Sequence, residues 1–243
     1  MPVVFSEWMV VNIKTRRAHF WSLTLVAVLA VGCGGSRGGA EGDAGASGVP
    51  PSLPRAESAA EDSIDLVLAG KRDKVVKMAG RLDDLANGDL PRDLQDVASA
   101  DEIKELQSRT ADFVRIAPDG EPVAVGLAAN RAFELIAGFF GRYETKTPGE
   151  VLLLDYYDFE AKLQALAHDM AKVRATVDRM AGIWLGLDDA VRSHRGGSGP
   201  ADAFDAHVAA MERLTTGSDF PALVKEAQHG LDLVDELEHV FVS

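Results

Sequence analysis

Apolar residues recur with a helical period along most of the chain. Over residues 152–191 they are spaced alternately four and three residues apart, the a/d pattern of helices that bury one face. Shorter runs with the same period cover 125–143 and 223–241. Glycine and proline are concentrated between such runs, in NGDLP, APDGEP, KTPGE and RGGSGP. The pattern predicts an all-α protein, an antiparallel helical bundle with short connections.

The apolar seam over 152–191 is long for one helix in a domain of this size. A continuous helix over this seam would measure about 60 Å at about 1.5 Å per residue. The neighbouring apolar runs are much shorter and would leave half of it uncovered. We therefore expect a bend or a break near His168 and Asp169.

A second pattern is a repeat of the apolar spacing at an offset of 98 residues. The matching sets are Val125, Ala129, Ala132, Ile136, Phe139 and Tyr143 with Leu223, Ala227, Gly230, Val234, Leu237 and Phe241, and Leu106, Thr110 and Phe113 with Phe204, Val208 and Met211. The residues themselves are rarely identical, so only their spacing supports a repeat. Two similar helical halves, a TPR-like stack and a simple bundle all remain open.

Residues 34–60 contrast with the helical part in composition. They are rich in Gly, Ser, Ala and Pro and contain almost no large apolar side chain. Such a segment buries too little surface to offset the entropy lost on ordering. We expect a flexible tether over 33–60 and one α-helical domain over 61–243.

The first 32 residues have the layout of a secretory signal peptide. Three basic residues lie within 14–17, and an uncharged apolar run follows from Phe20 to Val31. This run of 12 residues is shorter than the roughly 20 that a membrane-spanning helix needs. Translation from Met9 instead of Met1 would give the basic segment an ordinary length, and both starts stay open.

The only cysteine of the chain, Cys33, follows this apolar run directly. The residues LAVGC at 29–33 resemble the lipobox of bacterial lipoproteins, with a small residue, Gly32, before the cysteine and with Ala30 where many lipoboxes have Leu. The resemblance covers only the first 33 residues or so. It implies cleavage between Gly32 and Cys33, acylation of Cys33, and anchoring in the membrane through the acyl chains. Gly34 in place of Asp after the cysteine points to the outer membrane if the source is Gram-negative.

One cysteine excludes disulfides and zinc sites built from cysteines.

The last helical run contains two Glu-x-x-His motifs, at 226–229 and 236–239. Di-iron bundles need such motifs on two facing helices, whereas these two share one predicted helix. His229, Glu236 and His239 lie opposite the apolar seam and are expected to face water.

Two other groups of residues could carry chemistry. Asp155 and Asp158 flank a Tyr pair, which suggests acid–base chemistry if one carboxylate were desolvated. On a helical wheel Asp158 falls on the polar face, while Asp155 falls at the edge of the seam, where a hydrogen bond to a neighbouring helix is expected. Trp184 lies in the seam and is expected to be buried, with a partner for its N–H.

His207 and Met211 are four residues apart, a spacing that would suit copper or haem iron on one helix face. Met211 belongs to the seam, and His207, at its flank, is expected to be a surface histidine. The chain contains no Ser-His-Asp set, phosphate-binding glycine loop or H-E-x-x-H motif. We therefore expect no catalytic residues, cofactor or metal.

The charge of the chain excludes one further class of function. Its net charge is −13, and such an acidic protein does not bind nucleic acid through phosphate contacts. The sequence predicts a lipid-anchored envelope protein, not an enzyme, with a helical domain that binds another envelope protein or peptide. The alternative is a bundle that binds a small ligand, metal or haem between its helices, with His207 and Met211 involved.

Overall fold

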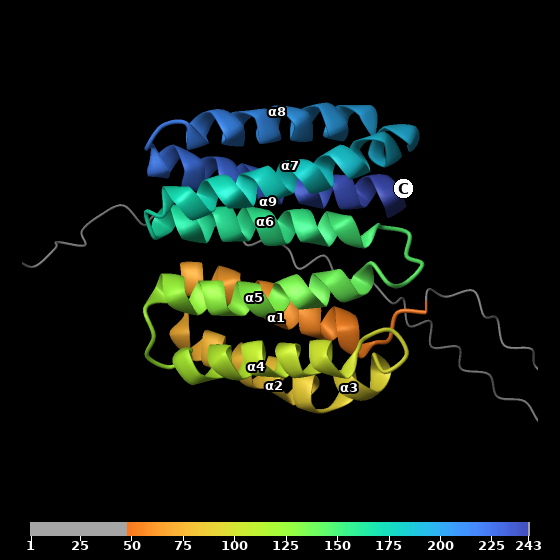
Figure 1. The fold of residues 1–243 in the computed structure, drawn as a ribbon, viewed down its shortest axis with the longest axis vertical. Coiled ribbons are helices and arrows are strands. Elements are labelled where there is room, and N and C mark those ends of the chain that lie inside the picture. The colour runs from red at the N-terminus through yellow and green to blue at the C-terminus, as the bar shows by residue number, and fades with distance from the viewer. Residues whose placement is uncertain (1–47, 243) are drawn as a thin grey trace, which may run out of the picture. The chain divides into compact units, whose positions relative to one another are not determined.

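The structure is a computed structural model, and it describes residues 48–242 (Figure 1). In this part of the chain we find nine α-helices and no strand. The helices are α1 (Ser52–Leu68), α2 (Arg72–Asn87), α3 (Asp89–Asp93), α4 (Ala100–Ile116), α5 (Pro122–Phe140), α6 (Gly149–Leu166), α7 (Met170–Ser193), α8 (Ser198–Thr215) and α9 (Phe220–Val242). The predicted all-α bundle is confirmed. The predicted signal peptide, Cys33 and the first part of the predicted tether lie outside the described residues.

The helices form two similar halves, α1–α5 and α6–α9, seen one above the other in Figure 1. Helices α1, α2, α4 and α5 correspond to α6, α7, α8 and α9, and each begins 97 or 98 residues before its counterpart. In both halves the first helix packs against the second and the fourth, and the third packs against the same two. The short α3 is an addition of the first half. Of the arrangements that the sequence left open, the structure has two similar halves at the offset of the apolar spacing.

Helix α6 joins the two halves because it packs against α5 of the first half and against α7 and α9 of its own. The approach of α5 to α6 is close: a Cβ at Gly126 would lie 2.7 Å from the Leu163 side chain. The Phe159 ring of α6 meets the Phe133 ring of α5 edge to face at 6.5 Å. The sequence predicted one apolar face for this helix, whereas α6 is covered on several sides.

The predicted break in the long seam is confirmed. Helix α6 ends at Leu166 and α7 begins at Met170. Between them His168 has a φ of 59°, in the left-handed region that a continuing helix does not allow. The Asp169 carboxylate then accepts a hydrogen bond from the Lys172 backbone N–H at 3.2 Å and caps α7. The seam is thus folded back on itself as two antiparallel helices.

The predicted boundary between tether and domain is wrong. Helix α1 begins at Ser52, and it fully buries Leu53, Ala56, Ala59 and Ala60. The composition of this stretch suggested a tether because its side chains are small. Small side chains also let two helices approach closely, and α1 packs along α5. The folded domain therefore includes residues 52–60.

Helix α5 is the one helix among the described residues that is long and apolar enough to cross a membrane. It lies between α1, α4 and α6. Its buried residues include Ala129, Phe133 and Ile136, all with no exposed surface. Packing inside the bundle therefore accounts for its apolar composition.

Candidate functional site

Helix α6 carries polar residues into the interior of the second half. Asp155, Asp158, Lys162 and Gln164 are all buried, although they belong to a helix whose neighbours supply mostly apolar surface. A buried charge is costly unless it is paired and hydrogen-bonded. The partners of these side chains are therefore the first place to look for a site.

The most buried of these partners is His207 of α8, which stands between two carboxylates. Its Nε2 lies 3.0 Å from Oδ1 of Asp158 on α6, and its Nδ1 lies 3.1 Å from Oε1 of Glu226 on α9. The side chains of His207 and Asp158 have no exposed surface, and that of Glu226 is 23% exposed. We call these three residues the His207 cluster. It ties together three of the four helices of this half.

The two carboxyl groups favour the protonated form of the imidazole. An ionised carboxylate only accepts hydrogen bonds, and only the imidazolium can donate from both ring nitrogens to two carboxylates. Burial by itself lowers the pKa of His207, but the charge and hydrogen bond of Asp158, together with Glu226, outweigh burial and raise that pKa above its usual value.

Gly230 of α9 makes room for this cluster. A Cβ at this position would overlap with the Asp158 carboxylate and with Nε2 of His207. Any side chain would therefore push the imidazole and the carboxylate apart. The Phe204 ring covers another side of the imidazole at 5.2 Å, and the exposed His229 ring approaches it at 6.3 Å.

Two predictions for this region are wrong. Asp158 is fully buried instead of lying on a polar face, and His207 is 1% exposed instead of lying on the surface. The helical wheel assumed a single buried face for each helix. Because α6 is covered on several sides, its second face is also interior, and the ring of His207 is directed at it.

The other residues named from the sequence lie as expected. His229, Glu236 and His239 are exposed on α9, and Met211 is fully buried in the core. Asp155 is buried at the edge of the seam.

A metal or haem does not fit the His207 and Met211 pair. Both ring nitrogens of His207 face carboxylates, so neither has a lone pair to offer to a metal. Within residues 48–242 no group of three or more His, Cys, Asp or Glu side chains is placed to hold a metal ion. Met211 packs in the core, and His207 bonds to Asp158 and Glu226.

A second polar network connects α6 to its other neighbours. Asn130 of α5 donates to the Tyr156 carbonyl at 3.2 Å and to Glu160 at 2.8 Å, which joins the two halves. Gln164 bridges Glu160 and Thr176 of α7. These bonds hold α6 in register with α5 and α7.

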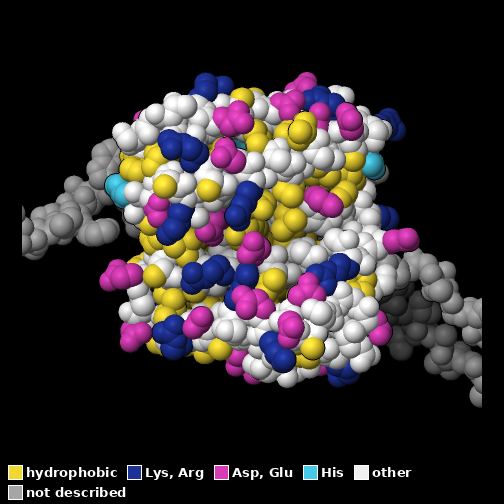
Figure 2. Space-filling model, in the orientation of Figure 1, with side chains coloured by type: hydrophobic (Ala, Val, Ile, Leu, Met, Phe, Trp, Pro, Cys, Tyr) yellow, Lys and Arg dark blue, Asp and Glu magenta, His cyan; other side chains and the backbone are white. Residues whose placement is uncertain are grey.

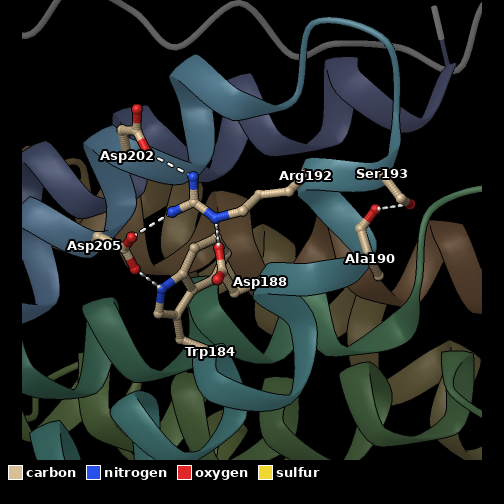
Figure 3. Close-up of polar contacts among 7 residues, drawn as sticks. All are labelled: Trp184, Asp188, Ala190, Arg192, Ser193, Asp202 and Asp205. Atoms are coloured by element: carbon tan, nitrogen blue, oxygen red, sulfur yellow. Dashed lines mark hydrogen bonds and ion pairs between the residues drawn. The ribbon is translucent and has the colours of Figure 1, made fainter.

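The α7–α8 hairpin is closed by a third polar cluster, shown in Figure 3. The buried Trp184 donates its indole N–H to Asp205 at 2.7 Å, which confirms the predicted burial and partner. Arg192 at the end of α7 pairs with Asp188, Asp202 and Asp205. The guanidinium thus holds the start of α8 against the end of α7.

In each of the three polar clusters the side chains bond to one another, and these bonds connect neighbouring helices. The His207 cluster has the groups to hold and release a proton. We compared the chain with protein-family models, curated proteins and solved structures, and none of the three comparisons gives a match.

Proposed function

We propose that this protein is a lipid-anchored bacterial envelope protein whose helical body binds another envelope protein or peptide and is not an enzyme. The observation that carries the proposal is Cys33 at the end of LAVGC, after a basic segment and a short apolar run. The acyl chains expected on Cys33 would attach it stably, because each buried CH₂ contributes about 0.8 kcal/mol.

The structure of the body supports a binding role over a catalytic one. In the strongest candidate for chemistry, the His207 cluster, both ring nitrogens are engaged and the imidazole packs against Gly230 and Phe204. The outer faces of the helices remain available, and pairs of helices offer grooves for partner segments. Leu185 on α7 is 82% exposed and marks one such outer face.

Replacing Cys33 by Ser tests the anchor. The unchanged protein should sediment with membranes and resist an alkaline carbonate wash, whereas Cys33→Ser should no longer do so. If Cys33→Ser still resisted the wash, an uncleaved apolar segment would hold the protein and the lipid anchor would be refuted.

The binding role is tested by site-specific crosslinking in the native envelope. A photoreactive residue at position 185 should crosslink to one defined protein, and the same residue at His239, on an exposed face of α9, serves as a comparison. Elemental analysis and an absorption spectrum of the purified protein cover the alternative. A stoichiometric metal or a haem spectrum would contradict the proposed function and favour a ligand-binding bundle.

A further inference from the structure

The first turns of α2 form a basic patch on an otherwise acidic protein. We define this basic patch as Lys71, Arg72, Lys74 and Lys77, all of which are exposed. They lie within seven residues that include one acidic residue, Asp73, although the whole chain has a net charge of −13. The opposite face of α2 is buried in the core through Val75, Ala79 and Leu82, so the patch is presented by a fixed helix.

The ion pairs of the protein leave out the lysines of the basic patch, as they leave out some other cations. Elsewhere in residues 48–242, six of the twelve other arginines and two of the five other lysines form ion pairs, for example Arg109 with Glu105 and Glu134. On the face shown in Figure 2, basic and acidic side chains are accordingly mixed. Among the described residues none pairs with the three lysines of the patch, and Arg72 donates to the Gly120 carbonyl at 2.9 Å.

The surface around the basic patch is shallow. The patch lines an open hollow beside Gly70, at the turn between α1 and α2. The hollow has a volume of about 470 Å³, which is within the range of about 300–1,000 Å³ of small-molecule sites, but such sites are concave and mostly apolar. This hollow is open to solvent and lined mainly by charged residues. Its shape therefore fits a broad charged surface better than an enclosed ligand.

The position of the basic patch on a protein with a proposed lipid anchor favours a lipid surface as its partner. Arginine forks suit carboxylates and phosphates alike, but three of the four cations here are lysines, which are flexible point charges. Clusters of basic residues close to a bilayer are attracted to its anionic headgroups. The attraction acts over a Debye length of about 8 Å at physiological salt, and charges farther away than this are screened.

We propose that the basic patch on α2 docks onto anionic phospholipid headgroups of the membrane to which the chain is anchored. This rests on the proposed lipid anchor, which keeps the body close to that surface. Docking would fix the orientation of the domain and leave the second half, α6–α9, directed at its partner. The partly exposed Val76, 39% accessible, lies within the patch and would contact the headgroup region.

The test uses the full lipidated protein reconstituted into vesicles. An environment-sensitive dye is attached at Val76→Cys and, as a comparison in the other half, at Leu185→Cys. The vesicles contain phosphatidylcholine alone or phosphatidylcholine with phosphatidylglycerol, with a quencher on the lipid headgroup. At low ionic strength the dye at position 76 should be quenched several-fold more on the anionic vesicles than on the neutral ones. The dye at position 185 should respond equally to both.

Charge reversal provides the matched control. Lys71→Glu, Lys74→Glu and Lys77→Glu together should abolish the difference at position 76, and so should high salt. The control changes Lys104, Lys172 and Lys225, exposed lysines outside the patch, and should leave the difference intact although the net charge changes equally.

Equal quenching of position 76 on both kinds of vesicle would overturn the docking proposal while the protein stays attached. Loss of the protein from both kinds of vesicle would instead refute the anchor. An acidic peptide, tetraglutamate, is then added to the anionic vesicles. If it releases the dye-labelled patch only at the ionic strength at which a simple salt does so, the result supports lipid docking. Saturable binding of that peptide to the patch, with no lipid response, would overturn it in favour of an acidic protein partner.

Discussion

Replacing Gly230 by Ala should destabilise the protein, against the usual trend in helices. In the interior of a helix, alanine is ordinarily more stable than glycine by about 0.5–1 kcal/mol. At position 230 the added Cβ would overlap with the Asp158 carboxylate and with Nε2 of His207. Both side chains are fully buried, so neither can move aside into solvent.

The magnitude follows from two costs. Overpacking a close-packed interior costs about 1–3 kcal/mol, and separating a buried ion pair adds to this, up to about 3–5 kcal/mol when one partner is lost entirely. Since the Asp158–His207 bond would be strained and not removed, we expect a net loss of about 2–4 kcal/mol after the gain in helix propensity. For a domain of this size the loss corresponds to a melting temperature lower by roughly 5–15 °C.

The assay is urea denaturation followed by circular dichroism, with Gly182→Ala as the matched control. Gly182 lies on α7 with no heavy atom near the position of its Cβ, so Gly182→Ala should stabilise the protein by about 0.5–1 kcal/mol. If Gly230→Ala were as stable as Gly182→Ala, the close packing of the His207 cluster would be refuted.

Three further predictions concern protonation and the domain boundary. Burial first, and then the charges of Glu238 and Asp155, raise the pKa of the half-buried Glu57 to about 7, although a hydrogen bond with Glu61 opposes the shift. The folded state therefore loses stability as pH rises from about 4.5 to 7. In denaturation experiments Glu57→Gln should raise the free energy of unfolding by about 2 kcal/mol at pH 8 and by little at pH 4.5. The pKa of His207 is also raised, so its contribution to stability is complete below about pH 6.5 and is lost as pH rises through the folded-state value. His207→Gln should remove the corresponding decline of stability above about pH 6.5 in denaturation experiments, and an unchanged decline would contradict a protonated His207 in the folded state. A fragment of residues 48–243 should unfold cooperatively when followed by circular dichroism. A fragment of residues 61–243, which lacks half of α1, should be markedly less stable in the same experiment. Equal stability of the two fragments would show that residues 52–60 are dispensable.

The sequence was most informative about features that depend on local periodicity. The 4-3 spacing of apolar residues predicted the seams of α5, α6, α7 and α9, and the length of the seam over 152–191 predicted the break at His168. The offset of 98 residues made a repeated arrangement one of the open alternatives, and it matches the offset between corresponding helices. These features follow from chain geometry alone, because a helix of period 3.6 must bury the face on which its apolar residues fall.

The features that sequence reasoning missed depend on tertiary packing. Residues 52–60 seemed too poor in large side chains to fold, but their alanines are fully buried in α1, which packs against α5. Asp158 and His207 were assigned to exposed faces because only one buried face per helix was considered. Two signals were present. Apolar residues occupy several faces of 149–166, and Gly230 interrupts the apolar face of α9 at the point where the His207 cluster needs space.

The most direct test of the central proposal is the mass of the N-terminal peptide of the mature protein, purified from native membranes and analysed by mass spectrometry. The lipid anchor predicts that this peptide begins at Cys33 and carries the added mass of a diacylglyceryl group on sulfur. A mature chain that begins at Met1 or Met9, or anywhere else, with an unmodified thiol at Cys33 would contradict it.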